Sequence, residues 1–225
     1  MIETKGVDPN VRGGPYAIAA GQARYMVERS DWKGAAALPV QPTRFAYVDA
    51  VTHFARALGA ARSGHLDGAA ADIAKIAELR EKLRQGKDAY WSEQVDIQWQ
   101  IASAWLLQAQ SKHDEALAMM RDAADAEDKT EKSVVTPGPL APARELYGTM
   151  LLQRGMGADA LAQFDAVLHK EPNRFNAVAG AAESAKRVGD TAKAKNYSQK
   201  LIALAGGGDV TRPAVVAARR LLAIR

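Results

Sequence analysis

The strongest constraint on the fold is a turn that recurs five times along the 225 residues. Each copy has a serine or glycine five positions before an alanine, and the pairs are Ser30 and Ala35, Gly64 and Ala69, Ser111 and Ala116, Gly155 and Ala160, and Gly189 and Ala194. The alanines are 34 residues apart in the first two copies and in the last two, and 47 and 44 residues apart in the middle. A period near 34 residues indicates a repeated helix-turn-helix unit.

Composition favours helices along the whole chain. There are 46 alanines and 18 glycines, and the alternating runs of β-branched residues that predict strands are absent. Pro39 is expected to shorten the second helix of the first unit, and an insertion at 78–90 to lengthen the helices on either side of a break at Gln85 and Gly86. Glycine and proline also predict a break at 13–15. The predicted fold class is all-α.

A second pattern concerns the position twelve residues before each of the five alanines. It holds only small residues, which are Ala23, Ala57, Ala104, Gly148 and Ala182. With the alanines in the twentieth position of a repeat, this pattern resembles the tetratricopeptide family, in which the eighth position lies where two helices touch. Phe164 and Pro172 extend the resemblance in the fourth unit. Residues 136–148 and 171–177 are similar to the C-terminal part of a group of longer bacterial tetratricopeptide proteins without assigned activity.

The resemblance implies a right-handed α-solenoid of about five tetratricopeptide-like units with a C-terminal capping helix. The expected units lie near 16–42, 45–86, 89–128, 141–174 and 175–206, within an array that covers 15–210. Residues 1–14 are expected to be disordered or a linker, and the abrupt start suggests a piece of a longer protein. Residues 211–225 are expected to cap the array, because the last unit of a stack must cover its apolar face. A membrane-surface or partner helix is the alternative there.

Several classes of function are disfavoured by composition. There is no cysteine and only four scattered histidines, so neither a metal nor a cofactor is expected. The net charge is only +4 without a basic stripe, which argues against a nucleic-acid partner. The polar N-terminus lacks a secretory signal, and no apolar stretch approaches the roughly 20 residues that cross a bilayer. We expect a soluble chain without a membrane partner, in a compartment that the sequence leaves open.

Motifs for catalysis are weak. Gly155, Gly157 and Ala160 fit a GxGxxA dinucleotide fingerprint, but that motif must follow a strand and here it lies on the repeated turn. His53 is either a catalytic residue or a partly buried residue between helices, and its position four residues before Ala57 favours the second interpretation. Neither GxSxG nor a phosphate-binding loop occurs. The sequence therefore predicts that the chain is not an enzyme and has no catalytic residues.

The remaining prediction is protein or peptide binding through the concave face that the resemblance assigns to the first helix of each unit. The residues expected there are Arg24, Phe54, Arg62, Trp105, Glu145, Asn176, Glu183 and Arg187. Trp105, Arg24 and Arg62 are the expected anchors, because tryptophan and arginine often dominate interface energies. Trp105 as a core residue between units is the alternative. The Lys, Asn and Arg clamp that binds acidic chaperone tails is not reproduced.

The insertion at 127–140 is a second candidate, and Thr136, Pro137 and Pro139 are its expected functional residues. It either folds over the groove or is a plain connector. The alternative function is a structural or regulatory module of a larger protein, with intramolecular or homotypic contacts that include a homo-oligomer. A recognition module leaves its groove open, whereas a structural module covers it with its insertion, its N-terminal segment or a second copy.

Overall fold

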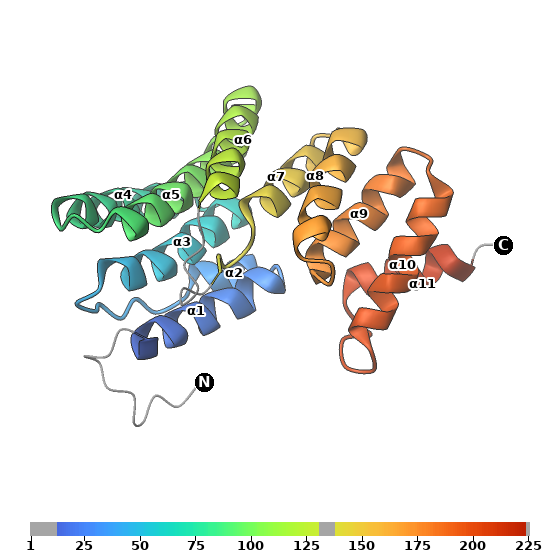
Figure 1. The fold of residues 1–225 in the computed structure, drawn as a ribbon, viewed down its shortest axis with the longest axis horizontal. Helices are drawn as coiled ribbons and strands as arrows, with labels where there is room; N and C mark the ends of the chain where they lie inside the picture. The colour runs from blue at the N-terminus through green and yellow to red at the C-terminus, as the bar shows by residue number, and fades with distance from the viewer. Residues whose placement is uncertain (1–12, 131–137, 224–225) are drawn as a thin grey trace. The chain divides into compact units, whose positions relative to one another are not determined.

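The structure is a computed structural model that describes residues 13–130 and 138–223. Every regular element in these two ranges is an α-helix, which confirms the predicted all-α class for the described part of the chain (Figure 1). The chain divides into two compact units, Met1–Ala143 and Arg144–Arg225.

The first unit contains helices α1 to α6. Their bounds are α1 Gly13–Glu28, α2 Trp32–Ala36, α3 Ala46–Ser63, α4 Leu66–Gln85, α5 Ala89–Ala109 and α6 His113–Lys129. Helix α3 packs between α1 and α5, and α2, α4 and α6 each pack against the helix that precedes them in the chain (Figure 1). Helices α1, α3 and α5 therefore form a layer that can present a continuous surface.

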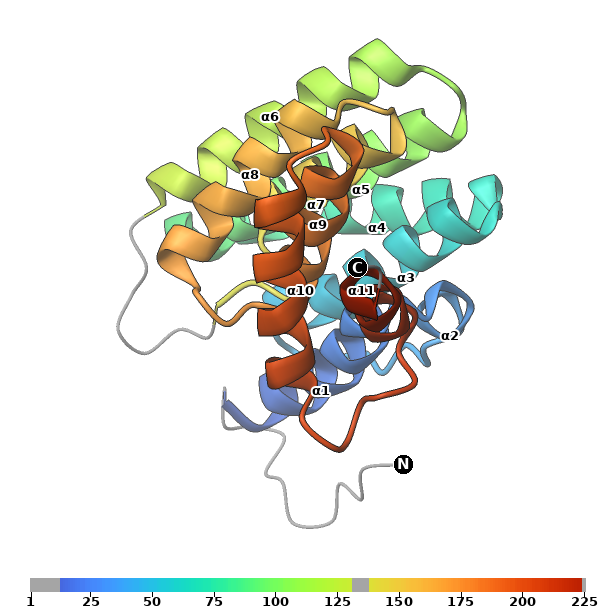
Figure 2. The same ribbon diagram turned by 90° about the vertical axis from the view of Figure 1, so that its right-hand side faces the viewer.

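The second unit contains helices α7 to α11. Their bounds are α7 Ala143–Gln153, α8 Gly157–Lys170, α9 Phe175–Arg187, α10 Thr191–Ala205 and α11 Pro213–Ala223. Helix α9 packs against both α8 and α10, and α11 packs against α10 and α9 (Figure 2). Val215 of α11 is fully buried in a cluster with Val178 and Leu201, whereas Arg219 and Arg220 are exposed. Helix α11 thus presents one apolar side to the unit.

The five recurring turns have the same backbone geometry. The serine or glycine of each turn has a positive φ, and the values are 55° at Ser30, 87° at Gly64, 64° at Ser111, 79° at Gly155 and 80° at Gly189. In every turn the N–H of the next residue donates to the carbonyl five residues earlier, at 2.9 to 3.0 Å. This is the Schellman arrangement that ends a helix, and its positive φ explains glycine in three of the five turns.

Small residues lie where paired helices touch, as the spacing predicts. The alanine that follows each turn is at most 1% exposed, and Ala23, Ala57 and Ala104 are fully buried. At Gly148 a Cβ atom would lie 3.0 Å from the ring of Phe164 in α8. Helix pairs in both units therefore depend on side chains no larger than a methyl group at these positions.

Three local predictions can be compared with the helix bounds. Helix α2 ends at Ala36, before Pro39, and α4 ends at Gln85, so the predicted shortening and the predicted break are both confirmed. The predicted break at 13–15 is wrong, because these residues form the first turn of α1. Proline is tolerated there, since the first N–H groups of a helix have no partner within it. Residues 1–12 lie outside the described ranges.

Candidate functional site

The end of the 127–140 insertion packs on the layer of α1, α3 and α5. Leu140 and Ala141 are each 2% exposed. Together with Gly138 and Pro139 they border a cavity of about 20 Å³, whose other walls come from α1, α3, α5 and Glu127. The helix residues on these walls are Tyr16, Phe54, Trp91, Gln94, Ile97, Gln98 and Ile101. We call residues 138–141 the covering segment.

Arg24 of α1 holds the backbone of the covering segment. Its Nη2 atom donates to the carbonyl oxygens of Gly138 at 3.1 Å and Pro139 at 3.0 Å. Beyond the segment, the N–H of Ala143 donates to the Glu127 carboxylate at 2.7 Å. Contacts to main-chain atoms are how proteins commonly grip extended peptides, with specificity left to side-chain pockets. The large buried side chain of this segment is that of Leu140.

Prolines explain why the covering segment is not helical. Pro139 and Pro142 have no N–H to donate, and each disfavours helical geometry in the residue before it. The segment from Gly138 therefore stays outside helical structure, with a bend at Leu140 and Ala141, until α7 begins at Ala143. Carbonyl groups outside a helix have no partner in a helical ladder, so a side chain such as Arg24 can donate to them.

The covering segment leaves part of the face unsatisfied. The Gln94 Nε2 and Gln98 Oε1 atoms are buried without a hydrogen-bond partner among the described residues, and both side chains border the cavity. A buried amide atom without a partner costs about 1–3 kcal/mol. A volume of 20 Å³ has room for about one water molecule. The face thus offers a donor and an acceptor that the covering segment does not use.

Aromatic rings form the floor beside this segment. The rings of Tyr47 and Trp91 stack at 4.2 Å between centroids, and Tyr16 lies 5.7 Å from Trp91 and 6.1 Å from Tyr47. Burial raises the pKa of the Tyr16 phenol above its ordinary value, with the positive charge of Arg24 acting in the opposite direction. These rings come from α1, α3 and α5 and hold the three helices together under the segment.

Arg62, Trp105 and Phe54 lie within the first unit. The guanidinium carbon of Arg62 is 3.9 Å from the ring centre of Trp32 and 4.2 Å from that of Trp105. Trp105 and Phe54 are only 3% and 2% exposed, so both side chains are buried within the first unit. Arg24 and Phe54 both lie beside Pro139 of the covering segment, whereas Thr136 and Pro137 lie outside the described residues.

The other four predicted site residues belong to the second unit, and each is hydrogen-bonded to another residue of that unit. The Glu145 carboxylate is 3% exposed and accepts two bonds from Arg174, at 2.8 and 2.9 Å. Asn176 accepts a bond from Arg212 at 3.0 Å. Arg187 donates to Glu183 at 2.9 Å and to the carbonyl of Leu152 at 2.8 Å. These side chains connect helices of the unit, with Arg187 exposed at its surface.

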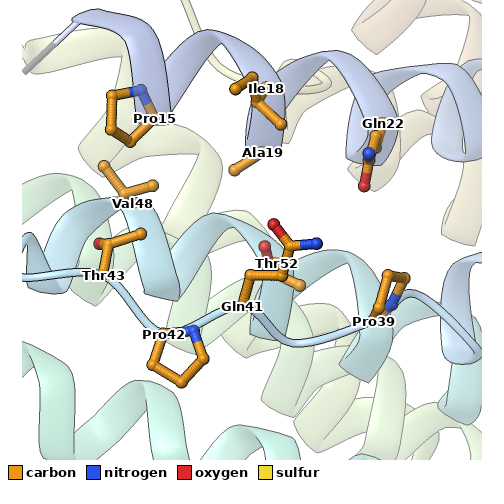
Figure 3. Close-up of a pocket in the computed structure, with 10 residues that line it drawn as sticks. All are labelled: Pro15, Ile18, Ala19, Gln22, Pro39, Gln41, Pro42, Thr43, Val48 and Thr52. Atoms are coloured by element: carbon orange, nitrogen blue, oxygen red, sulfur yellow. The ribbon is translucent and has the colours of Figure 1, made fainter. Parts of the chain in front are cut away.

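A second hollow in the first unit was not predicted from the sequence. It has a volume of about 290 Å³ and lies between α1, residues 39–43 and the start of α3 (Figure 3). Its walls are Pro15, Ile18, Ala19, Gln22, Pro39, Gln41, Pro42, Thr43, Val48 and Thr52. None of these side chains is ionisable, so the hollow suits a neutral group and supplies no acid or base.

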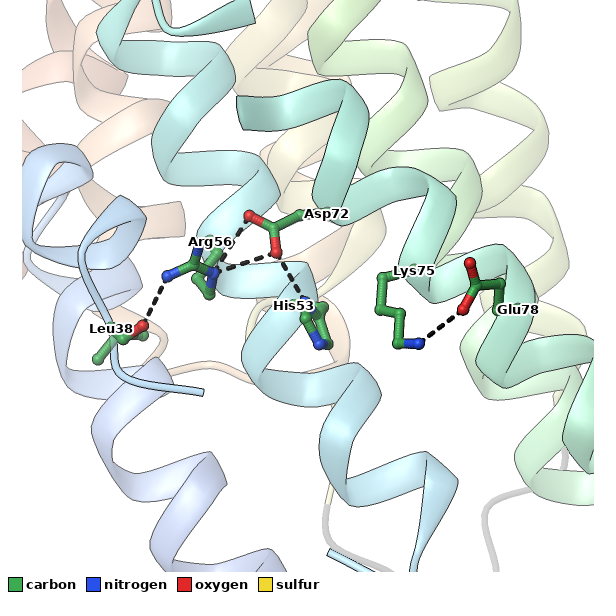
Figure 4. A network of polar contacts seen from close by, with 6 residues as sticks. All are labelled: Leu38, His53, Arg56, Asp72, Lys75 and Glu78. Atoms are coloured by element: carbon green, nitrogen blue, oxygen red, sulfur yellow. Dashed lines mark hydrogen bonds and ion pairs between the residues drawn. The ribbon is translucent and has the colours of Figure 1, made fainter. Parts of the chain in front are cut away.

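His53 belongs to a buried polar network between α3 and α4 (Figure 4). Its Nδ1 atom lies 2.7 Å from Asp72 Oδ1, and the same carboxylate accepts from Arg56 Nε at 3.1 and 3.2 Å. Arg56 also donates to the carbonyl of Leu38 at 2.7 Å. The charge of Asp72 is therefore balanced by Arg56, and the histidine is 9% exposed. This arrangement ties α3 and α4 to the loop after α2 and agrees with the interpretation of His53 as a residue between helices.

The described residues contain neither a candidate metal site nor a helix that could span a membrane. No group of three or more histidine, aspartate or glutamate side chains in 13–130 and 138–223 is arranged to hold a metal ion. Within the same ranges, no helix combines the length and apolar character needed to cross a bilayer. Comparison of the chain with protein-family models, curated proteins and solved structures gives no match.

Gln94, Gln98, Trp32 and Leu140 are site residues that the sequence analysis missed. The two glutamines are four residues apart on α5 and so share a helix face, but many surface glutamines do as well. Leu140 had a usable signal, because it is the large apolar residue in a proline-rich stretch. An apolar side chain within a polar connector often marks a segment that packs on something.

Proposed function

We propose that the chain is a non-catalytic scaffold that recognises an extended segment of a protein or peptide. In this proposal its hairpins are about five tetratricopeptide-like units stacked as a right-handed α-solenoid. The proposal is supported by the five turns of equal geometry and by the small residues between paired helices. It requires no cofactor, nucleic acid or membrane.

The observation that carries the proposal is the binding of the covering segment by the first unit. Arg24 holds two successive carbonyl groups, and Leu140 is buried against the layer of α1, α3 and α5. A partner peptide would use the same backbone and side-chain contacts. It could in addition satisfy Gln94 and Gln98, whose buried amide atoms the covering segment leaves without partners.

The same observation favours a second function, a structural module that is permanently closed by its own insertion. In that case residues 138–141 are part of the core of the first unit and never leave it. The two functions differ in one measurable property, which is whether a separate peptide can take the place of the covering segment.

The test uses the full chain and an acetylated, amidated peptide with the sequence of residues 138–142, Gly-Pro-Leu-Ala-Pro. Binding to the wild type is compared with binding to a Leu140→Ser variant by calorimetry. Burial of a leucine side chain contributes about 1.5–3 kcal/mol, so we expect the variant to bind the peptide about ten to a hundred times more tightly. A peptide with serine in place of its leucine is the control.

Arg24→Gln in the Leu140→Ser background is the second arm. It should weaken peptide binding, because the guanidinium that holds the two carbonyl groups is lost. Circular dichroism establishes that each variant is folded. If folded Leu140→Ser chains are destabilised but bind no peptide, the recognition proposal fails and the structural module stands.

A further inference from the structure

Arg62 is a largely buried cation that no carboxylate of the described residues neutralises. It lies near the end of α3, between Trp32 at the start of α2 and Trp105 of α5. No described residue accepts a hydrogen bond from its guanidinium or forms an ion pair with it. Burial lowers the pKa of Arg62 to about 10, so the group is still charged at neutral pH.

The two tryptophan rings contact this guanidinium but accept no hydrogen bonds from it. A planar guanidinium offers its faces to aromatic rings and its five N–H groups in the plane. With ring centres at 3.9 and 4.2 Å, the indoles contact the cation but accept no in-plane hydrogen bond. The donors in the plane of the Arg62 guanidinium are therefore available for an acceptor from outside the described chain.

Trp105 adds a second donor at the same place. Its indole Nε1 atom is buried and has no hydrogen-bond partner among the described residues. Buried donors without acceptors are rare in proteins, and each one calls for an explanation. The buried indole N–H and the charged guanidinium belong to side chains in contact, and an acceptor with negative charge would be stabilised beside them.

The backbone of the chain prepares this position. Gly59 lies three residues before Arg62 and so on the same side of α3. A Cβ atom at Gly59 would overlap the backbone of Ala36 and Trp32, so the missing side chain is what lets α2 approach. The close approach brings Trp32 over Arg62, and the rings hold the long arginine side chain in one orientation before any ligand arrives.

We propose that Arg62, held between Trp32 and Trp105, binds a carboxylate group of the peptide partner. This inference rests on the proposed function and names the chemistry of its ligand. A carboxylate has one negative charge to match one guanidinium, and its two oxygens can accept two parallel N–H bonds. A phosphate group carries about two charges and would remain half neutralised by a single arginine. The carboxylate belongs either to an acidic side chain or to the C-terminus of the peptide.

The test is a titration of the full ¹⁵N-labelled chain with sodium acetate, with sodium chloride at equal ionic strength as the control. We expect saturable shifts of the Arg62 Nε–H and Trp105 Nε1–H signals with acetate alone. Arg62→Met keeps most of the side-chain volume without the charge and should weaken binding about tenfold or more. Arg219→Met removes an exposed arginine of α11 in the second unit and should leave acetate binding unchanged.

Two further probes identify the source of the carboxylate. N-acetylglycine presents a C-terminal carboxylate, and N-acetylglutamic acid α-amide presents a side-chain carboxylate, so the tighter of the two names the group recognised. Tighter binding of inorganic phosphate than of acetate would overturn the assignment. Equal shifts with acetate and chloride, or equal shifts in wild type and folded Arg62→Met, would overturn the site itself. Acetate binding is measured without the 138–142 peptide, so either result can fail alone.

Discussion

The turn residues show how single positions determine this fold. Ser30 and Ser111 take the positive φ that glycine takes in the three other turns. A left-handed conformation costs a residue with a Cβ atom roughly 1 kcal/mol, whereas glycine adopts it freely. Serine at these two positions therefore stores a small strain that the hydrogen bonds of the turn outweigh.

Ser111→Gly is expected to stabilise the chain. Ser111 is exposed and has a φ of 64°, so glycine relieves strain without removing a buried contact. The free energy of unfolding in urea should rise by about 0.5–1 kcal/mol. Gly189→Ser makes the reverse change at the equivalent turn and should lower it by a similar amount. A loss of stability in Ser111→Gly would contradict this account of the turns.

Tyr197 gives a prediction for pH dependence. Burial, together with a hydrogen bond from its hydroxyl to Asp165, raises the pKa of Tyr197 from 10 to about 12. The folded chain thus holds this proton more tightly than the unfolded chain. The stabilisation is complete below pH 10 and is lost as the pH rises through 12.

Tyr197→Phe removes this contribution at every pH. The difference in unfolding free energy between wild type and variant should therefore shrink between pH 10 and 12 and stay constant between pH 7 and 9. Urea unfolding at pH 8 and pH 11 measures it. A difference that grows at high pH would show that the phenol is not held in its neutral form.

At the scale of elements, close approach of helices depends on glycine at particular contacts. Gly59 of α3 lies against the backbone of α2, whereas a Cβ atom at Gly68 of α4 would be 3.7 Å from the nearest atom, in ordinary contact. Both are helical glycines, so alanine gains helix propensity at both positions. Alanine substitutions at the two positions therefore distinguish the effect of helix propensity on stability from the effect of helix packing.

Gly59→Ala should lower the free energy of unfolding by about 1–3 kcal/mol, because α2 must move away from α3. Gly68→Ala should raise it by about 0.5–1 kcal/mol through helix propensity alone. Thermal and urea unfolding of the matched pair measure both changes. Equal stabilisation by the two alanines would show that α2 is not held as closely as the structure has it.

The features that could be predicted from the sequence are those that depend on residues close together in the chain. The turns, the short α2 and the break after Gln85 follow from glycine, serine and proline at particular positions. The contact from Arg24 to Gly138 joins residues 114 apart, and no local pattern specifies which carbonyl a surface arginine will reach. The sequence leaves Trp105 as either a binding anchor or a core residue. The structure adds that its side chain is only 3% exposed and contacts Arg62.

At the scale of the whole molecule, the residues predicted for one continuous surface fall in two units. Arg24, Phe54, Arg62 and Trp105 belong to the first unit, while Glu145, Asn176, Glu183 and Arg187 belong to the second and are bonded within it. The first unit alone contains both the covering segment and the tryptophan-flanked arginine. The proposed peptide recognition therefore involves the first unit alone, and we expect substitutions of Arg187 to leave peptide binding unchanged.

The proposed function requires the covering segment to exchange with a separate peptide. The most direct measurement follows the methyl signals of Leu140 in the wild-type chain, labelled with ¹³C, during titration with the 138–142 peptide. We predict that these signals move from buried positions to those of solvent-exposed leucine as the peptide saturates. If the Leu140 methyl signals keep the chemical shifts of a buried leucine throughout the titration, the segment does not exchange and the proposed function is contradicted.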